Sequence, residues 1–293
     1  MKLIAPDYYL EFNCIADKCK HNCCIGWEID IDDSTYKYYQ TLTGKFEEKI
    51  KKSISTYGTP HFILDKNERC PFLNDNNLCD IIAELGHDKL CQICSDHPRF
   101  RNFLSDRTEI GLGFCCEEAV HIALNKKDKT RLVQLNDYDE QLTKFEINFL
   151  NFRNNLFDII QNRNMSIDKR IELMLNVCNA RIPKKTIAEW ANIYLSLERL
   201  DPKWTDMLIN ISTKENDLNL NIEFEQFLFY LIYRHLTDAI NYGDISKRAS
   251  FIAVSYLLIK QLCITYNVEE SVRMYCSEIE YSENNLYSLI DMM

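Results

Sequence analysis

The spacing of hydrophobic residues predicts a series of helices in the carboxy-terminal part of the chain. In residues 140–161, Leu142, Phe145, Phe149, Phe152 and Leu156 fall on one stripe with helical periodicity. Similar patterns predict helices over 166–180, 183–200, 223–242, 245–266 and 269–289, with Pro183 suited to a first helical turn and Gly243 to a helix end. Short connections between such helices are typical of a bundle or helical array.

The first part of the chain has a different pattern. Residues 33–53 have apolar and aromatic positions compatible with one exposed helix or two short ones, and most of the remainder consists of short segments between turn residues. Most glycines and four of the six prolines lie before residue 120. We therefore expect a mainly α protein in which an irregular cysteine-rich module, residues 1–120, packs on a helical domain, residues 121–293.

Three of the thirteen cysteines fit the core of the predicted helices. Cys178, Cys263 and Cys276 continue the apolar faces of their segments. Because a free cysteine behaves as a small hydrophobic residue, we interpret these three as packing residues.

The other ten cysteines form groups with the spacing of metal ligands. Two to four residues separate many neighbouring thiols, which lets them turn toward one ion or cluster. Such a density in a chain without a recognisable export signal favours metal binding over structural disulfides or coincidental core thiols. The ten candidate ligands are Cys14, Cys19, Cys23, Cys24, Cys70, Cys79, Cys91, Cys94, Cys115 and Cys116.

The spacing alone leaves zinc and iron–sulfur chemistry both open, since both accept four thiolates. Ten thiols exceed the needs of one tetrahedral site, so we expect two centres or one centre with additional sulfurs nearby. The radical SAM pattern Cys-x3-Cys-x2-Cys is nearly met twice. Gly26 stands in the third position after Cys19 and Cys23, and His87 stands in the first before Cys91 and Cys94.

Positive side chains follow the Cys91 and Cys94 pair closely. Arg99 and Arg101 are candidates to offset the negative charge of a thiolate centre or to contact a cofactor. His97 is a weaker candidate ligand, since a single histidine is more often structural.

Several classes of function are disfavoured. The formal net charge of −10 argues against a protein that mainly binds nucleic acid. The longest apolar run, residues 251–259, is far shorter than the roughly 20 residues that span a bilayer, so we expect no membrane span and a cytoplasmic protein. Phosphate-binding, serine-hydrolase and zinc-protease motifs are absent, and the few glycines make a Rossmann domain improbable.

The order of these motifs resembles a known bacterial family. "C-x4-C-x3-CC", "CPFL" with "LCDII", "CQIC" with "HPR", "GFCCEEA" and the segment "YCSEIEYSENNLYSLI" are similar to the zinc- or iron-chelating cysteine-rich domains, and most closely to their flagellin lysine-N-methylase branch. The similarity covers residues 1–120 specifically, and the helical remainder mainly at that last segment.

The resemblance implies methyl transfer from S-adenosylmethionine to lysine side chains of flagellin. It also implies an iron–sulfur cluster, of the four-iron four-sulfur type, held by the first eight candidate cysteines, with Cys115 and Cys116 as additions of the methylase branch. No residue stands out as the base that deprotonates the lysine. The residues near the motifs that qualify are Tyr36, Tyr38, Tyr39, Glu117 and Glu118.

Two other functions compete with the methyltransferase. The first is a zinc- or iron-binding module without enzymatic activity that presents its helices to a partner. The second is an iron–sulfur protein of electron transfer or redox sensing.

Overall fold

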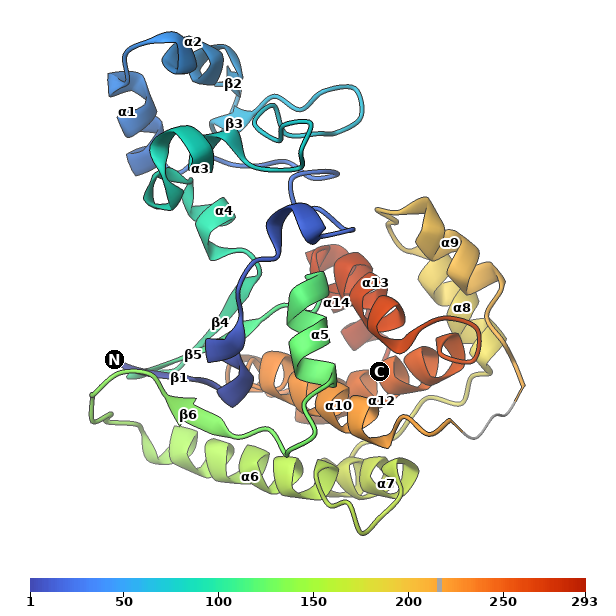
Figure 1. Ribbon diagram of the computed structural model, residues 1–293. Coiled ribbons are helices and arrows are strands. Elements are labelled where there is room, and N and C mark those ends of the chain that lie inside the picture. Colours follow the sequence, from blue (N-terminus) through green and yellow to red (C-terminus); the bar gives the residue numbers. More distant parts are fainter. Residues whose placement is uncertain (215–217) are drawn as a thin grey trace. The chain divides into compact units, whose positions relative to one another are not determined.

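The computed structural model describes residues 1–214 and 218–293 (Figure 1). It is mainly α-helical, as the sequence predicts. The helices are α1 Asp33–Thr41, α2 Lys45–Lys52, α3 Asp80–Leu85, α4 Gln92–Asp96, α5 Glu117–Leu124, α6 Lys144–Ile160, α7 Ile167–Val177, α8 Ile187–Ser196, α9 Pro202–Ile209, α10 Asn221–His235, α11 Ala239–Tyr242, α12 Ile245–Leu262, α13 Val268–Glu280 and α14 Glu283–Asp291. The strands are β1 Lys2–Pro6, β2 Ile54–Ser55, β3 His61–Phe62, β4 Arg99–Phe103, β5 Arg107–Leu112 and β6 Leu132–Gln134.

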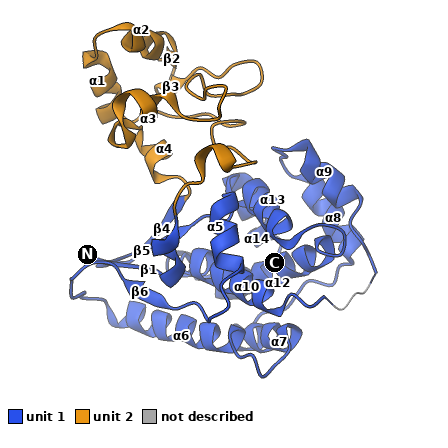
Figure 2. Ribbon diagram, in the orientation of Figure 1, with its two compact units in different colours: residues 1–12, 99–293 blue, residues 13–98 orange. Residues whose placement is uncertain are grey.

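The chain forms two compact units, which Figure 2 distinguishes by colour. Residues 1–12 and 99–293 form the helical unit, and residues 13–98 form the cysteine unit. This division does not coincide with the composition boundary at residue 120. The reason is the four-stranded sheet β4-β5-β1-β6, which pairs the amino terminus with strands after residue 98 and places all of them with the helices.

The sheet of the helical unit was not expected from the sequence. Strand β1 runs parallel to β5, with Ile4 opposite Glu109, and antiparallel to β6. Strands β4 and β5 form an antiparallel pair in which Phe100 lies opposite Gly111. A Cβ atom on Gly111 would lie 2.3 Å from the Phe100 ring, so this close packing requires glycine. The strands are short and only some alternate in polarity, which explains why periodicity did not reveal them.

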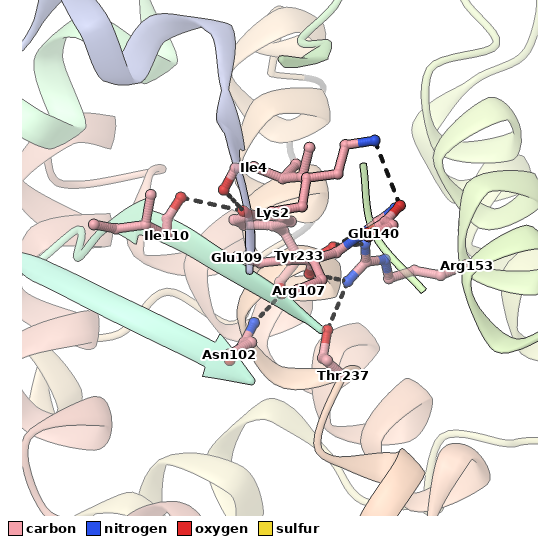
Figure 3. A network of polar contacts seen from close by, with 10 residues as sticks. All are labelled: Lys2, Ile4, Asn102, Arg107, Glu109, Ile110, Glu140, Arg153, Tyr233 and Thr237. Atoms are coloured by element: carbon pink, nitrogen blue, oxygen red, sulfur yellow. Dashed lines mark hydrogen bonds and ion pairs between the residues drawn. The ribbon is translucent and has the colours of Figure 1, made fainter. Parts of the chain in front are cut away.

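A buried ion pair fastens this sheet to the helices (Figure 3). The Arg153 guanidinium of α6 donates two hydrogen bonds to Glu109 of β5, at 2.5 and 2.6 Å, and a third to Thr237. Both partners of the ion pair are fully buried. Tyr233 of α10 donates to the carbonyl oxygens of Ile4 and Ile110, which joins α10 to two neighbouring strands. Polar contacts therefore fix the register between sheet and helices.

The helical core follows the predicted apolar stripes with three corrections. Helix α8 begins at Ile187 rather than at Pro183, because Thr186 and Glu189 form a capping box. The segment 269–289 is split into α13 and α14 by Ser282, whose hydroxyl caps α14. Phe145 does not join the buried stripe of α6 and is 62% exposed, whereas Phe149 and Leu156 are buried.

The remaining predicted helices are confirmed with shorter bounds. Residues 33–53 form two helices rather than one, because Gly44 has φ +116 between α1 and α2. Residues 223–242 divide into α10 and α11, and 245–266 contain α12. Cys178 and Cys276 are buried in the helical core, and Cys263 packs against it, as expected. Across the described ranges, no helix is both long and apolar enough to cross a bilayer.

The cysteine unit has its own small core. Ile29, Ile31, Tyr39, Phe62 and Phe72 are among its buried residues, and Cys70 and Cys91 belong to the same cluster. The Phe62 and Phe72 rings lie 4.9 Å apart in an edge arrangement. Few elements surround this core, so other interactions must contribute to the stability of the unit.

Candidate metal centre

Six thiols from four separate segments gather in the cysteine unit. We call Cys23, Cys24, Cys70, Cys79, Cys91 and Cys94 the thiol cluster. The Cys91 and Cys94 sulfurs lie 3.3 Å apart, and the Cys23 and Cys24 side chains are hydrogen-bonded to each other. The Cys24 thiol is electrostatically coupled to Cys70 and Cys79, and the Cys94 thiol to Cys24 and Cys70. The fold thus brings together cysteines up to 70 positions apart, from Cys24 to Cys94.

Backbone hydrogen bonds position the first two segments of the cluster. The Cys70 amide donates to the Cys24 carbonyl at 2.8 Å, and the Gly26 amide donates to the Glu68 carbonyl at 3.0 Å. Gly26 has φ +89, a conformation that favours glycine and lets the chain turn directly after the two adjacent cysteines. The glycine that interrupts the radical SAM pattern therefore has a structural reason for its position.

Helix α4 positions the last two thiols. Cys91 is the residue before the first turn of α4, and Cys94 lies one turn later on the same side. Asp32 caps α1 and also accepts a hydrogen bond from the Gln92 amide at 2.8 Å, so one carboxylate joins α1 to the start of α4. The buried Tyr39 hydroxyl donates to the Lys89 carbonyl just before this helix. The N-cap of α1, Asp32, and Tyr39 within the helix thus hold the segment that carries Cys91.

Burial and mutual repulsion make most of the cluster thiols weak acids. Burial raises the pKa of Cys70 to about 11 and also raises the pKa of Cys79. The hydrogen bond within each close pair lowers the pKa of one thiol, Cys23 or Cys91, and raises the pKa of its partner, Cys24 or Cys94. The partner must lose its proton beside a thiolate that is already negatively charged. Several thiolates can therefore coexist here only beside a compensating cation, and metal ions supply that charge.

The sulfurs are arranged as close pairs rather than as one tight tetrahedron. Within residues 1–214 and 218–293, the group of three possible metal ligands with all ligand atoms within 4.8 Å of one another contains Glu28, Asp30 and His61, and no cysteine. Tetrahedral zinc would hold its four sulfurs about 3.8 Å apart. A polynuclear cluster is larger and holds its cysteines farther apart.

The other predicted ligands lie outside the thiol cluster as defined. Cys14 is exposed, and its sulfur accepts a hydrogen bond from the Ala16 amide at 3.4 Å. Cys19 is half-buried at the end of a short 3-10 helix, Ala16–Lys18. His97 follows α4 and has its ring 6.1 Å from that of Trp27. All thirteen cysteines are free thiols, so none forms a disulfide.

Cys115, Cys116, Arg99 and Arg101 belong to the helical unit. Arg99 donates to the Tyr9 hydroxyl at 2.9 Å and lies over the Tyr9 and Phe12 rings, while Arg101 is exposed on β4. Cys116 precedes α5. Ligation by the two cysteines and charge compensation by the two arginines stay predictions.

Cys115 instead joins a buried polar network that the sequence did not reveal. Its thiol donates to the Tyr281 hydroxyl at 3.1 Å, and burial raises its pKa to about 12. Glu280 accepts hydrogen bonds from Tyr230 at 2.5 Å and contacts His235 at 2.7 Å and Arg234 at 3.2 Å. The network joins "GFCCEEA" to "YCSEIEY", two of the segments on which the family resemblance depends. In the sequence, only the adjacent cysteines of "CC" pointed to this network. Its other residues lie in or next to predicted helices and have no distinctive spacing.

The candidate bases occupy different environments. Tyr39 is fully buried, and burial together with the nearby thiols of Cys91, Cys94 and Cys79 raises its pKa, so it is a poor proton acceptor. Tyr36 and Tyr38 are half-buried on α1 of the cysteine unit. Glu117 and Glu118 lie in the first turn of α5 in the helical unit.

Comparison with known proteins confirms the resemblance to the lysine-N-methylases. The chain is 28% identical over 141 residues to proteins named lysine-N-methylase from Salmonella typhimurium and Salmonella choleraesuis, with 43% of this chain and 33% of each relative covered. It is 27% identical over 135 residues to the flagellar biosynthetic protein FliU of Salmonella muenchen, with 79% of that protein covered. The match spans about a third of the length of the lysine-N-methylases. No family model matches the chain, and no solved structure matches it significantly.

Proposed function

From the similarity of this chain to the lysine-N-methylases and FliU, we propose that it is a protein lysine N-methyltransferase with flagellin as substrate. The similarity to these relatives is the observation that carries the proposal. S-adenosylmethionine is the methyl donor in this proposal. The lysine nitrogen forms a bond to the methyl carbon as the bond from that carbon to the sulfonium breaks, and S-adenosylhomocysteine leaves.

The thiol cluster fits an iron–sulfur cofactor. It contains more than the four thiolates that such a cluster needs, and five of its six thiols are buried or half-buried. In the proposal, four ligands come from Cys24, Cys70, Cys79, Cys91 and Cys94, while Cys23 is the exposed partner of Cys24. When bound, the cluster would supply folding energy and an iron centre.

The chain itself must prepare the lysine for reaction. A lysine ammonium has an unperturbed pKa of about 10.4, so few molecules are neutral and nucleophilic near pH 7. Since Tyr39 is engaged with the Lys89 carbonyl, the candidate proton acceptors in this proposal are the carboxylates Glu117 and Glu118 and the half-buried Tyr36 and Tyr38. Single substitutions at these four positions, with iron content measured beside activity, separate a base from a packing residue.

Incubation of the anaerobically purified protein with methyl-labelled S-adenosylmethionine and flagellin from the same organism tests the proposal. We expect label on flagellin lysines, its loss with Cys91→Ser, and its retention with Cys178→Ser, which changes a thiol of the helical core. Absence of labelled lysine with the iron-loaded protein would refute the methyltransferase.

The length of the match favours one alternative. The match leaves about two thirds of the lysine-N-methylase sequence uncovered. The second candidate function is therefore a metal-binding module without catalytic activity. Stoichiometric iron or zinc together with unlabelled flagellin would support that function.

A further inference from the structure

A second group of possible metal ligands lies in the cysteine unit, and it contains no sulfur. Glu28 and Asp30 come from the segment after Gly26, and His61 begins β3. One ligand atom from each of the three side chains lies within 4.8 Å of the other two. The Glu28 carboxylate is 3.6 Å from Nδ1 of His61.

The backbone determines this grouping. Asp30 and His61 are directly opposite each other in an antiparallel bridge. Hydrogen bonds flank the bridge, from the Ile31 amide to the Pro60 carbonyl at 2.7 Å and from the Phe62 amide to the Ile29 carbonyl at 3.0 Å. Successive residues of extended chain point to opposite faces. Because Ile29, Ile31 and Phe62 are buried, Glu28, Asp30 and His61 share the outward face.

The two ring nitrogens of His61 have different surroundings. Its Nδ1 atom lies 2.8 Å from the Thr59 carbonyl oxygen, and Nε2 has no hydrogen-bond partner within the described part of the chain. In metal-binding histidines one ring N–H commonly donates to a carbonyl while the other nitrogen binds the ion. The Thr59 contact therefore favours the tautomer with its lone pair on Nε2, while Nδ1 is the ring nitrogen that lies 3.6 Å from the Glu28 carboxylate.

The local charge favours a cation as well. Two carboxylates lie within ligand distance of each other, and among residues 1–214 and 218–293 neither forms an ion pair with lysine or arginine. The repulsion between them is therefore not offset by a lysine or arginine in that part of the chain. A bound divalent ion would remove it.

We propose that Glu28, Asp30 and His61 bind one divalent cation of the manganese or ferrous class. Two carboxylates and one imidazole form an oxygen-rich set, which suits such ions, whereas the thiolates nearby select zinc and iron–sulfur clusters. The ion would join the segment that carries Cys24 to the one that carries Cys70, because the same two segments pair at Cys24 and Cys70. The site thus reinforces the thiol cluster without contributing to methyl transfer, and it stands whether or not the proposed activity is confirmed.

Titration of the full-length, iron-loaded protein with Mn²⁺, followed by the electron paramagnetic resonance signal of free Mn²⁺, tests the site. We expect one bound equivalent and at least a tenfold loss of affinity in Asp30→Asn and in His61→Ala. The matched controls Glu84→Gln and His87→Ala, which change exposed residues of the same unit, keep the affinity of the unchanged protein. Equal affinity in all four variants would overturn the proposal.

Two further measurements keep the test decisive if a variant does not fold. Glu28→Gln changes a side chain that is 66% exposed, so it should fold and still bind Mn²⁺ at least tenfold more weakly. In the unchanged protein, substoichiometric Mn²⁺ should broaden the ring signals of His61 before those of His87. Simultaneous broadening of both histidines, or none at His61, would show that the site does not exist.

Discussion

At the scale of single residues, four of the six thiols in the cluster have a raised pKa and ionise poorly without a cation. Burial raises the pKa of Cys70 to about 11. The pKa of Cys94 is raised because its thiol is hydrogen-bonded to Cys91 and would ionise beside the Cys91 thiolate. A metal centre reverses this cost, because the cation stabilises the thiolates that the protein interior disfavours. Loss of one ligand should therefore affect metal and fold together.

The substitution Cys91→Ser should remove the metal and most of the soluble protein. Cys178→Ser should retain full metal content and lose only modest stability, because it places a hydroxyl in the helical core. Iron, zinc and acid-labile sulfide content per chain, measured on both variants, compares them directly. Equal metal loss in the two would contradict the separation of ligating from packing thiols.

The substitution Glu109→Gln should be strongly destabilising. It leaves the fully buried Arg153 without its carboxylate, and breaking such a pair typically costs about 3–5 kcal/mol. Urea unfolding followed by circular dichroism measures the effect on the helical unit. The exposed pair of Lys169 and Glu172 supplies the control, since Glu172→Gln should cost less than about 1 kcal/mol. Similar losses in both variants would contradict a special role for the buried pair.

At the scale of elements, polar side chains at helix ends connect segments that are distant in sequence. Asp32 caps α1 and holds the start of α4, and Glu146 of α6 accepts hydrogen bonds from the Ser105 amide and hydroxyl in the β4–β5 connection. In both cases one carboxylate accepts hydrogen bonds both from the start of its own helix and from a distant segment. Substitution of either carboxylate should therefore also destabilise the neighbouring segment.

Asp32→Asn should loosen α4 as well as α1. Hydrogen bonds from Ser34, Gln92 and Thr35 outweigh burial and hold the pKa of Asp32 below its usual range, so the ionised carboxylate is the stabilising form. Faster amide exchange at Gln92 and Thr35 is the expected result. Asp33→Asn removes the same charge from the first turn without these hydrogen bonds, and should leave Gln92 protected. Unchanged exchange at Gln92 in Asp32→Asn would refute the connection.

Glu146 should contribute to the acid sensitivity of the helical unit. Burial opposes its ionisation, but hydrogen bonds from Ser105 and Thr143 lower its pKa to about 2. An unfolded glutamate titrates near 4.3, so this stabilisation is complete above that pH and disappears as the pH falls toward 2. Unfolding free energies of the unchanged protein should fall in this window, and those of Glu146→Gln should fall less steeply.

The control for this pH dependence is Glu283→Gln, which changes an exposed carboxylate at the start of α14. Its slope between about pH 2 and pH 4.3 should match that of the unchanged protein. A slope unchanged by Glu146→Gln would contradict the assignment.

At the scale of the whole molecule, the two units differ in how they are stabilised. The helical unit has an extensive apolar core in which most residues of α10 and α12 are buried. The cysteine unit has a small core and carries the thiol cluster. If the thiol cluster holds a metal as proposed, a unit this small should depend on it for much of its folding free energy.

Anaerobic removal of the metal by a chelator should therefore unfold one unit selectively. Amide exchange should accelerate throughout residues 13–98 while α10 and α12 keep their protection. Hydrogen exchange with mass spectrometry resolves the two units, and readdition of iron and sulfide should restore protection. Uniform loss of protection along the chain, or none, would contradict the separate dependence of the cysteine unit on metal.

The sequence by itself determined the helices of the carboxy-terminal part, the core role of Cys178 and Cys276, and the resemblance to the lysine-N-methylases. Local periodicity, capping residues and ligand spacing encode these features within a few turns of chain. Only the tertiary structure decided the sheet that joins β1 to β5, the hydrogen bond between Cys115 and Tyr281, and the network around Glu280. Each depends on contacts between distant segments, such as Ile4 with Glu109 and Cys115 with Tyr281, and pairing between strands leaves no periodic mark on either segment alone.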